Sequence, residues 1–156
     1  MAVWQASFYL VPRGAVARSG ALTPPVLNDT DWWASAAFPV DYQKRLAQVA
    51  SLVVSSTADV ETWGPADSNH IDVWSRDGRV RRVMTQVDVR RLDSRFGAAL
   101  LEFVRIAGAV LIRDDGLVVE PIIAAYAGAL RSSDAWRFAN DPAAFLASHS
   151  ATDDDE

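Results

Sequence analysis

The pair Asp77-Gly78 constrains the fold of this chain more than any other feature of its sequence. An Asp-Gly pair between two alternating segments favours the tight two-residue turn of a β-hairpin. Before the pair, residues 71–74 alternate in character, and after it valine or threonine occupies every second position from Val83 to Val89. The pattern predicts two antiparallel strands that each bury one face.

A second hairpin is predicted around Asp114-Asp115-Gly116, which separates two short apolar segments. Further strands are predicted over residues 3–11 and 59–63, and helices over residues 42–54, 93–107 and 121–131. Asp141-Pro142 predicts the start of a last short helical turn. Because hairpins outnumber βαβ crossovers, we expect an α+β fold with a mainly antiparallel sheet and two to three helices packed against it.

Two stretches of the sequence lack a clear periodic pattern. Residues 13–31 carry Gly14, Gly20 and the pair Pro24-Pro25, and we expect a long loop there. Residues 153–156 read DDDE, a run of like charges that is typical of a solvated tail. The sequence therefore predicts a single domain over residues 1–147 and an acidic disordered tail over residues 148–156.

The composition is that of a packed globular protein, and it excludes several kinds of chemistry. Half of the residues are hydrophobic and 22% are charged, so a core can form without cross-links. The sequence contains no cysteine, which excludes disulfides, thiolate nucleophiles and Cys-based metal sites. The pattern of a signal peptide and a membrane-spanning apolar run are both absent from the sequence, and we expect a cytoplasmic protein.

Polar and aromatic side chains around the first hairpin form the candidate binding site. They are Trp63, Asp67, Asn69, His70, Asp72, Trp74 and Arg76. Tryptophan beside arginine is typical of protein contact surfaces, because both side chains contribute strongly to interfaces. The same residue types also suit a structural role, as core tryptophans and as Asp or Asn side chains that bond the backbone of a turn.

Catalytic and metal-binding patterns are weak in this region. Ser68, His70 and Asp72 share one face of a strand, but that spacing does not by itself create the geometry of a catalytic triad. Asp67, Asn69 and Asp72 offer metal-binding oxygens, yet they lack the central glycine and the bidentate glutamate of a calcium loop. The sequence also lacks a phosphate-binding glycine motif. We therefore expect no catalytic residue, no metal and no cofactor, and an enzyme is the weaker interpretation.

Arginines gather around the first hairpin, which raises nucleic acid as a partner. They are Arg76, Arg79, Arg81, Arg82, Arg90, Arg91 and Arg95. A basic hairpin can follow a phosphate backbone. However, the formal charge is −5, and residues 153–156 contribute four of those negative charges, so the rest of the chain is close to neutral. Acidic residues also lie among the arginines, and we expect surface ion pairs rather than a nucleic-acid partner.

Four segments from Trp63 onward resemble a group of small bacterial α+β proteins of unassigned function. They are WGPADSNHIDV at 63–73, DG at 77–78, QVDVRRL at 86–92 and SDAWRFANDPAAFL at 133–146. Proteins of this general type often look like immunity proteins, which neutralise a toxin produced together with them. The resemblance carries no catalytic residues, and what it implies is a protein partner.

Three functions stay open on the sequence. The first is a non-enzymatic protein-binding module, an immunity-like inhibitor of a partner protein. The second is a small-molecule binder or hydrolase with a site around Asp67, His70 and Asp72, and the third is a structural homodimeric subunit whose tryptophan-rich surface pairs with its own copy. We expect the first, because it needs a complementary surface and no reactive group.

Overall fold

The fold is built on one antiparallel sheet, seen in a computed structural model that describes residues 2–53 and 59–150. Within those residues the strands are β1 (Gln5–Pro12), β2 (Leu52–Val53), β3 (Val60–Trp63), β4 (His70–Arg76), β5 (Arg79–Asp88), β6 (Ala109–Arg113) and β7 (Val118–Val119). Their order across the sheet is β2-β3-β4-β5-β1-β6-β7, and every neighbouring pair is antiparallel. The predicted α+β class is confirmed.

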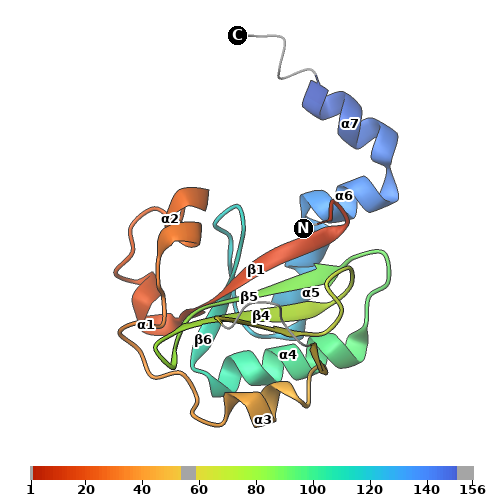
Figure 1. The fold of residues 1–156 in the computed structure, drawn as a ribbon. Helices are drawn as coiled ribbons and strands as arrows, with labels where there is room; N and C mark the ends of the chain where they lie inside the picture. Colours follow the sequence, from red (N-terminus) through yellow and green to blue (C-terminus); the bar gives the residue numbers. More distant parts are fainter. Residues whose placement is uncertain (1, 54–58, 151–156) are drawn as a thin grey trace.

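Helices in the described residues outnumber the predicted two to three. They are α1 (Arg13–Val16), α2 (Pro24–Asp29), α3 (Tyr42–Leu46), α4 (Ser94–Ile106), α5 (Ile123–Arg131), α6 (Asp134–Asn140) and α7 (Pro142–Ser150). In Figure 1, α3 and α4 lie together below the sheet, α2 lies on the opposite side, and α7 extends away from the sheet. Among the described residues, no helix combines the length and apolarity that crossing a membrane requires.

The register of the strands places the core on one face of the sheet. Phe8 lies opposite Thr85, and Thr85 lies opposite Ile71, so the three side chains share a face. All three are fully buried. Phe8 contacts Tyr126 of α5, with ring centroids 6.2 Å apart, which shows that helices cover this face.

The opposite face of the sheet carries more polar side chains. Tyr9 and Asp72 both lie opposite Met84, and Thr62 lies opposite Asp72. The hydroxyl of Tyr9 bonds the side chain of Asn28 in α2, so α2 covers part of this face. A functional site can therefore be sought on this polar face as well as around the first hairpin, where the sequence predicted one.

Helix α4 begins and ends where its sequence predicts. Asp93 Oδ1 accepts hydrogen bonds from the backbone N–H groups of Arg95 and Phe96, at 3.0 and 3.1 Å. Gly108 follows the helix with a φ of 64°, a left-handed conformation that favours glycine. The buried side of α4 consists of Phe96, Gly97, Leu100, Leu101, Phe103 and Val104.

Several predicted boundaries differ from the structure. The expected loop at residues 13–31 contains α1 and α2, because a proline pair suits the first turn of a helix. The helix predicted over residues 42–54 ends at Leu46, and Leu52 and Val53 pair with β3 instead; residue 54 lies outside the described residues.

The C-terminal part of the chain also departs from its prediction. Helix α6 was not expected, and the side chain of Ser133 caps it by accepting from the N–H of Trp136 at 3.2 Å. Helix α7 extends to Ser150, so residues 148–150 are helical where a disordered tail was expected. The rest of that predicted tail, residues 151–156, lies outside the described residues.

Candidate functional site

A β-bulge near the turn of the first hairpin shapes a surface that the strand pattern alone does not predict. Trp74 pairs with Arg82, but the next residue of β4, Ser75, pairs with Val80. Arg81 is therefore an extra residue on β5. The carbonyl oxygen of Arg81 accepts a hydrogen bond from the backbone N–H of Trp33 at 3.0 Å, which fixes a distant loop beside the hairpin.

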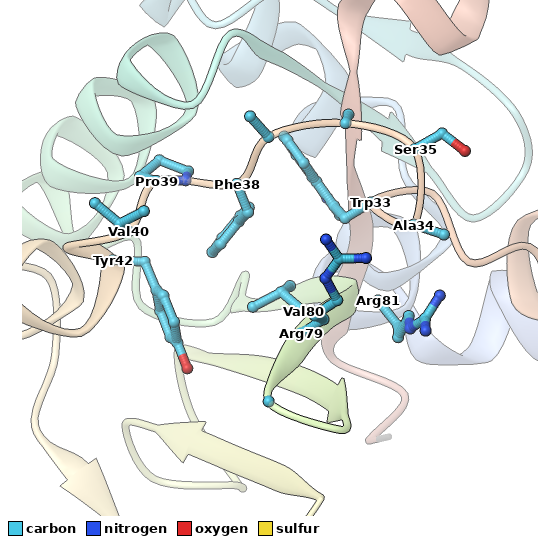
Figure 2. A pocket seen from close by; sticks show the side chains of 13 residues that line it. Trp33, Ala34, Ser35, Phe38, Pro39, Val40, Tyr42, Arg79, Val80 and Arg81 are labelled. Atoms are coloured by element: carbon cyan, nitrogen blue, oxygen red, sulfur yellow. The ribbon is translucent and has the colours of Figure 1, made fainter.

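A cavity of about 690 Å³ lies between that loop and the end of the hairpin; we call it the bulge cavity. Its lining comprises residues 33–40, Tyr42 and residues 78–81. In Figure 2 the side chains of Phe38, Tyr42 and Val80 point toward a common space, and Arg79 and Arg81 lie on the hairpin side of it. The cavity thus combines an apolar wall with cationic groups.

Aromatic packing holds the wall of the bulge cavity in place. Trp33 and Phe38 meet edge to face with centroids 4.8 Å apart, and Phe38 contacts Phe103 of α4 at 5.9 Å. The indole N–H of Trp33 donates to the carbonyl oxygen of Leu10 at 2.9 Å. Because Trp33 is buried and hydrogen-bonded, it anchors the wall to the core.

Glu61, the acid that bonds Tyr42 at this wall, has hydrogen-bond donors within the chain. Glu61 Oε1 accepts from the hydroxyl of Tyr42 and from Gln43 Nε2, each at 2.9 Å. Its other oxygen accepts from the indole N–H of Trp63 at 3.2 Å. Burial and the hydrogen bond to Glu61 raise the pKa of Tyr42 to about 12, so its hydroxyl stays neutral at physiological pH.

The arginines at the bulge cavity lack such partners. Within the described part of the chain, the side chains of Arg79 and Arg81, which line the cavity, form neither an ion pair nor a hydrogen bond, and the same holds for Arg76, which lies nearby on β4 outside the lining. The Nε of Arg81 is moreover buried without an acceptor, a state that costs free energy unless an acceptor arrives from elsewhere. Asp77 occupies the same turn and forms no ion pair with any of them among these residues.

Trp74 and Arg82 extend the cationic and aromatic surface onto the polar face of the sheet. The guanidinium of Arg82 lies 5.9 Å from the centroid of the Trp74 ring, within the range of a cation–π contact. Arg82 also lies 3.7 Å from Asp31, a pair in which both side chains are about one-third exposed. Trp74 is half-buried, which leaves part of its ring available to a partner.

The other end of the hairpin holds most of the residues that the sequence singled out, and there they bond to one another. His70 is buried; its Nδ1 lies 3.0 Å from the carbonyl oxygen of Ser68, and its Nε2 lies 3.4 Å from Asp72 Oδ2. Asp72 also accepts from the hydroxyl of Thr62 at 2.7 Å. Both ring nitrogens of His70 thus face protein oxygens.

The surroundings of His70 favour its protonated form. Burial alone lowers the pKa of His70, but the side chain of Asp72 and the backbone oxygen of Ser68 outweigh it, so the pKa lies above its ordinary value. A ring whose two nitrogens are both engaged has no free position from which to act as a general base. The hydrolase alternative at this residue stays a prediction, and the geometry does not favour it.

Asn69 and Asp88 tie the loop before β4 to the end of β5. Asn69 Oδ1 accepts from the backbone N–H of Asp88 at 2.7 Å. The carboxylate of Asp88 accepts from Arg90 Nε at 3.0 Å and from an Arg90 terminal nitrogen at 2.7 Å, and these bonds lower the pKa of Asp88. Arg90 in turn lies over the ring of Trp4, 4.1 Å from its centroid.

The seven residues predicted as a binding site therefore divide into separate groups. Trp63 is buried on the helix-covered face, because it lies opposite Ile71. Asp67 is exposed and lines a cavity of about 400 Å³ with Ser68, Asp88, Arg90 and Arg91. Trp74 and Arg76 lie toward the far end of β4, a strand whose seven residues span roughly 20 Å. The structure does not bring the seven together.

Sequence reasoning missed the loop that forms the wall of the bulge cavity. Trp33 and Phe38 come from a segment without a strong periodic pattern, Tyr42 was predicted only as the start of a helix, and Arg79 and Arg81 were grouped only as part of a basic cluster. The available signal was the run of aromatic residues in a segment otherwise rich in alanine and proline. Among the described residues, no cluster of three or more His, Cys, Asp or Glu side chains is arranged to hold a metal ion.

Comparisons with known proteins add no assignment to this geometry. No protein-family model matches the chain, and neither the curated proteins nor the solved structures contain a match.

Proposed function

We propose that this chain is a non-enzymatic protein-binding module that recognises an acidic, partly apolar segment of a partner protein at the bulge cavity. The observation that carries the proposal is the pair Arg79 and Arg81 in the cavity lining, with Arg76 nearby on β4, beside a preformed aromatic wall; none of the three side chains bonds an anion among the described residues. The immunity-like inhibitor that the sequence suggested is one form of such a module.

The distribution of ion pairs over the molecule supports this choice of surface. Seven other arginines do form ion pairs with acids of the chain: Arg13, Arg45, Arg82, Arg90, Arg105, Arg113 and Arg137. Arg79 and Arg81 at the bulge cavity are among the arginines whose side chains have no partner in the described residues; Arg18, Arg91, Arg95 and Arg131 also have none there, but they do not line this cavity. Carboxylates of a partner could supply the acceptors, and charge-assisted hydrogen bonds of this kind are stronger than neutral ones.

An apolar side chain of the partner would complete the contact. Phe38 and Val80 are partly buried against the core, and Val40 at the mouth of the cavity is fully exposed. Interfaces typically place an apolar anchor at the centre and charged groups around it. The bulge cavity has this arrangement, with Phe38 and Val80 inside and the arginines at the hairpin.

Charge favours a short acidic segment of a protein over nucleic acid. The whole chain carries a formal charge of −5, which opposes binding to a long polyanion. A peptide segment with a few carboxylates meets the local positive charge without the same long-range repulsion. Displacement of a bound peptide by a DNA duplex of equal charge would point to nucleic acid instead.

The proposal is tested by fluorescence anisotropy with a labelled peptide of alternating Glu and Leu, and with the same peptide carrying Gln for Glu. We expect the acidic peptide to bind at low salt and to weaken as salt rises, because exposed charges are screened. The double variant Arg79→Glu/Arg81→Glu should lose about tenfold or more in affinity, since it places like charges together. Trp74→Ala, at the edge of the surface, should lose only a few-fold.

Arg18→Glu is the matched control, because Arg18 is another exposed arginine outside the cavity. Equal binding of the Gln peptide, or an equal loss of affinity in Arg18→Glu, would contradict the proposal. Capture from a nuclease-treated lysate with the wild type, the double variant and this control would then identify the partner as the protein lost only with the double variant.

A further inference from the structure

A second exposed surface lies on the helical side of the molecule, between α4 and α5. A groove of about 220 Å³ runs between the two helices, and its lining is largely apolar. Leu92, Ile122 and Ile123 are exposed beside or within it, with 51, 54 and 70% of their surface open. Exposed apolar side chains that gather in this way mark interaction sites on soluble proteins.

Gly97 shapes the floor of the groove. A Cβ atom at this position would lie 3.1 Å from Tyr126 Cε1, so glycine allows the ring of Tyr126 to lie directly against α4. Ala98 of α4 and Ala127 of α5 line the same groove with small side chains. Small residues on both walls permit a further helix to approach closely.

Opposite charges stand on the two walls of this groove. Asp93, at the start of α4, uses Oδ1 to cap the helix, and Oδ2 takes no hydrogen bond within the described residues. Arg131, at the end of α5, forms no ion pair or hydrogen bond with any described residue. Both residues line the groove.

We propose that this groove is the interface of a homodimer, with a two-fold axis that runs along it. Such an axis places the α5 wall of one copy against the α4 wall of the other, so that Ile123 meets the apolar part of the partner's lining at Ala98 and Leu101. The same rotation exchanges the walls, so that Arg131 of each copy faces the free oxygen of Asp93 in its partner. The surface carries a projecting isoleucine, a groove and both charges, so two copies of it are complementary to each other.

This interface leaves the bulge cavity open, because the two surfaces share no lining residue. A dimer would therefore present two copies of the proposed binding site. The inference does not depend on the proposed function, since the oligomeric state is measured without any ligand.

Sedimentation equilibrium of the full chain over a wide range of concentrations tests the dimer. We expect a monomer–dimer equilibrium in the wild type. Ala98→Glu should raise the dissociation constant about tenfold or more, because it places an unpaired charge in an apolar contact. Ala98 is exposed and glutamate is a good helix former, so the variant should fold, as far-UV circular dichroism would show.

Ala144→Glu is the matched control, since Ala144 is exposed on α7 and lies outside the groove. It should leave the dissociation constant unchanged. A wild type that stays monomeric at every concentration would overturn the proposal, and so would a dimer that Ala98→Glu leaves as stable as the wild-type dimer.

The absence of cysteine from the sequence permits a direct test of the arrangement. When the variants Ala98→Cys and Ile123→Cys are mixed, mild oxidation should link one copy of each, because the two-fold axis brings the α5 wall of one copy to the α4 wall of the other. A mixture of Ala98→Cys with Leu146→Cys, whose cysteine would lie at an exposed position on α7, should link far more slowly. Equal rates of cross-linking in the two mixtures would overturn the proposed axis.

Discussion

The two ends of the β4–β5 hairpin use polar side chains in opposite ways. At the loop end, formed by residues 64–70 with Asp88 and Arg90, the side chains of Asn69, His70 and Asp88 bond within the chain. At the turn end, formed by residues 76–82, Arg76, Arg79 and Arg81 have no such bonds among the described residues. The residue types alone would have suggested function at either end.

The comparison teaches that the number of unusual polar residues is a poor guide to a binding site. A buried polar network whose members satisfy one another stabilises a fold and leaves little to offer a partner. Unpaired cations beside a preformed apolar wall can gain free energy when a partner supplies the missing acceptors. The difference predicts that changes at the loop end alter stability, whereas changes at the turn end alter binding.

The largest expected effect is that of Gly64→Ala at the loop end. Gly64 has a φ of 100°, and a Cβ there would lie 2.4 Å from the carbonyl oxygen of Asn69. We expect the free energy of unfolding to fall by about 3 kcal/mol, because both the backbone and the neighbouring loop must shift. Urea denaturation measures the change.

Gly78→Ala at the turn end is the matched control for that measurement. Gly78 has a φ of 72°, but a Cβ there would meet nothing within 4 Å. It should therefore lose about 1 kcal/mol, from the backbone conformation alone. Equal losses in the two variants would remove the predicted difference between the ends.

A smaller effect is expected when one charged side chain is removed from each end. Asp88→Ala should cost about 2 kcal/mol of unfolding free energy, because its carboxylate is buried and binds the guanidinium of Arg90, which is itself half exposed. Arg81→Ala should change it by no more than about 0.5 kcal/mol, since the side chain of Arg81 bonds none of the described residues. Thermal unfolding of both variants tests this, and a greater loss in Arg81→Ala would contradict it.

The smallest effect is a pH dependence that arises from His70. Because the pKa of His70 is raised in the folded state, its stabilising contribution is fully present below the unfolded value, near pH 6.5. The contribution is lost as the pH rises through the folded pKa, by at most about 1.4 kcal/mol per pH unit. Urea denaturation from pH 5.5 to 8.5 should show this decline in the wild type and not in His70→Gln. Parallel curves for the two proteins would show that His70 does not titrate in this way.

Local patterns predicted most of the sheet. Asp77 and Gly78 both adopt positive φ, at 52° and 72°, as the hairpin prediction requires, and Asp93 caps α4. Turns and caps depend on a few neighbouring residues, so the sequence specifies them. The segment from residue 13 to residue 46 was predicted poorly, because its short helices depend on contacts with the sheet more than on their own propensity.

The candidate site could be predicted only in part. The arginines of the hairpin were recognised as a cluster, but the wall of Trp33, Phe38 and Tyr42 was not. His70 was singled out because histidine is rare in this sequence. It is buried, and both of its ring nitrogens face protein oxygens. Whether a polar side chain is satisfied depends on residues distant in sequence, and no local pattern reports it.

The sequence by itself determined the antiparallel hairpins, the start and end of α4, and the concentration of arginine near Gly78, since each depends on short-range chemistry. The tertiary structure decided the bulge at Arg81, the docking of Trp33 on its carbonyl oxygen, and the pairing of some arginines and not others. These features follow from distances between groups far apart along the chain, and packing of the whole core sets those distances.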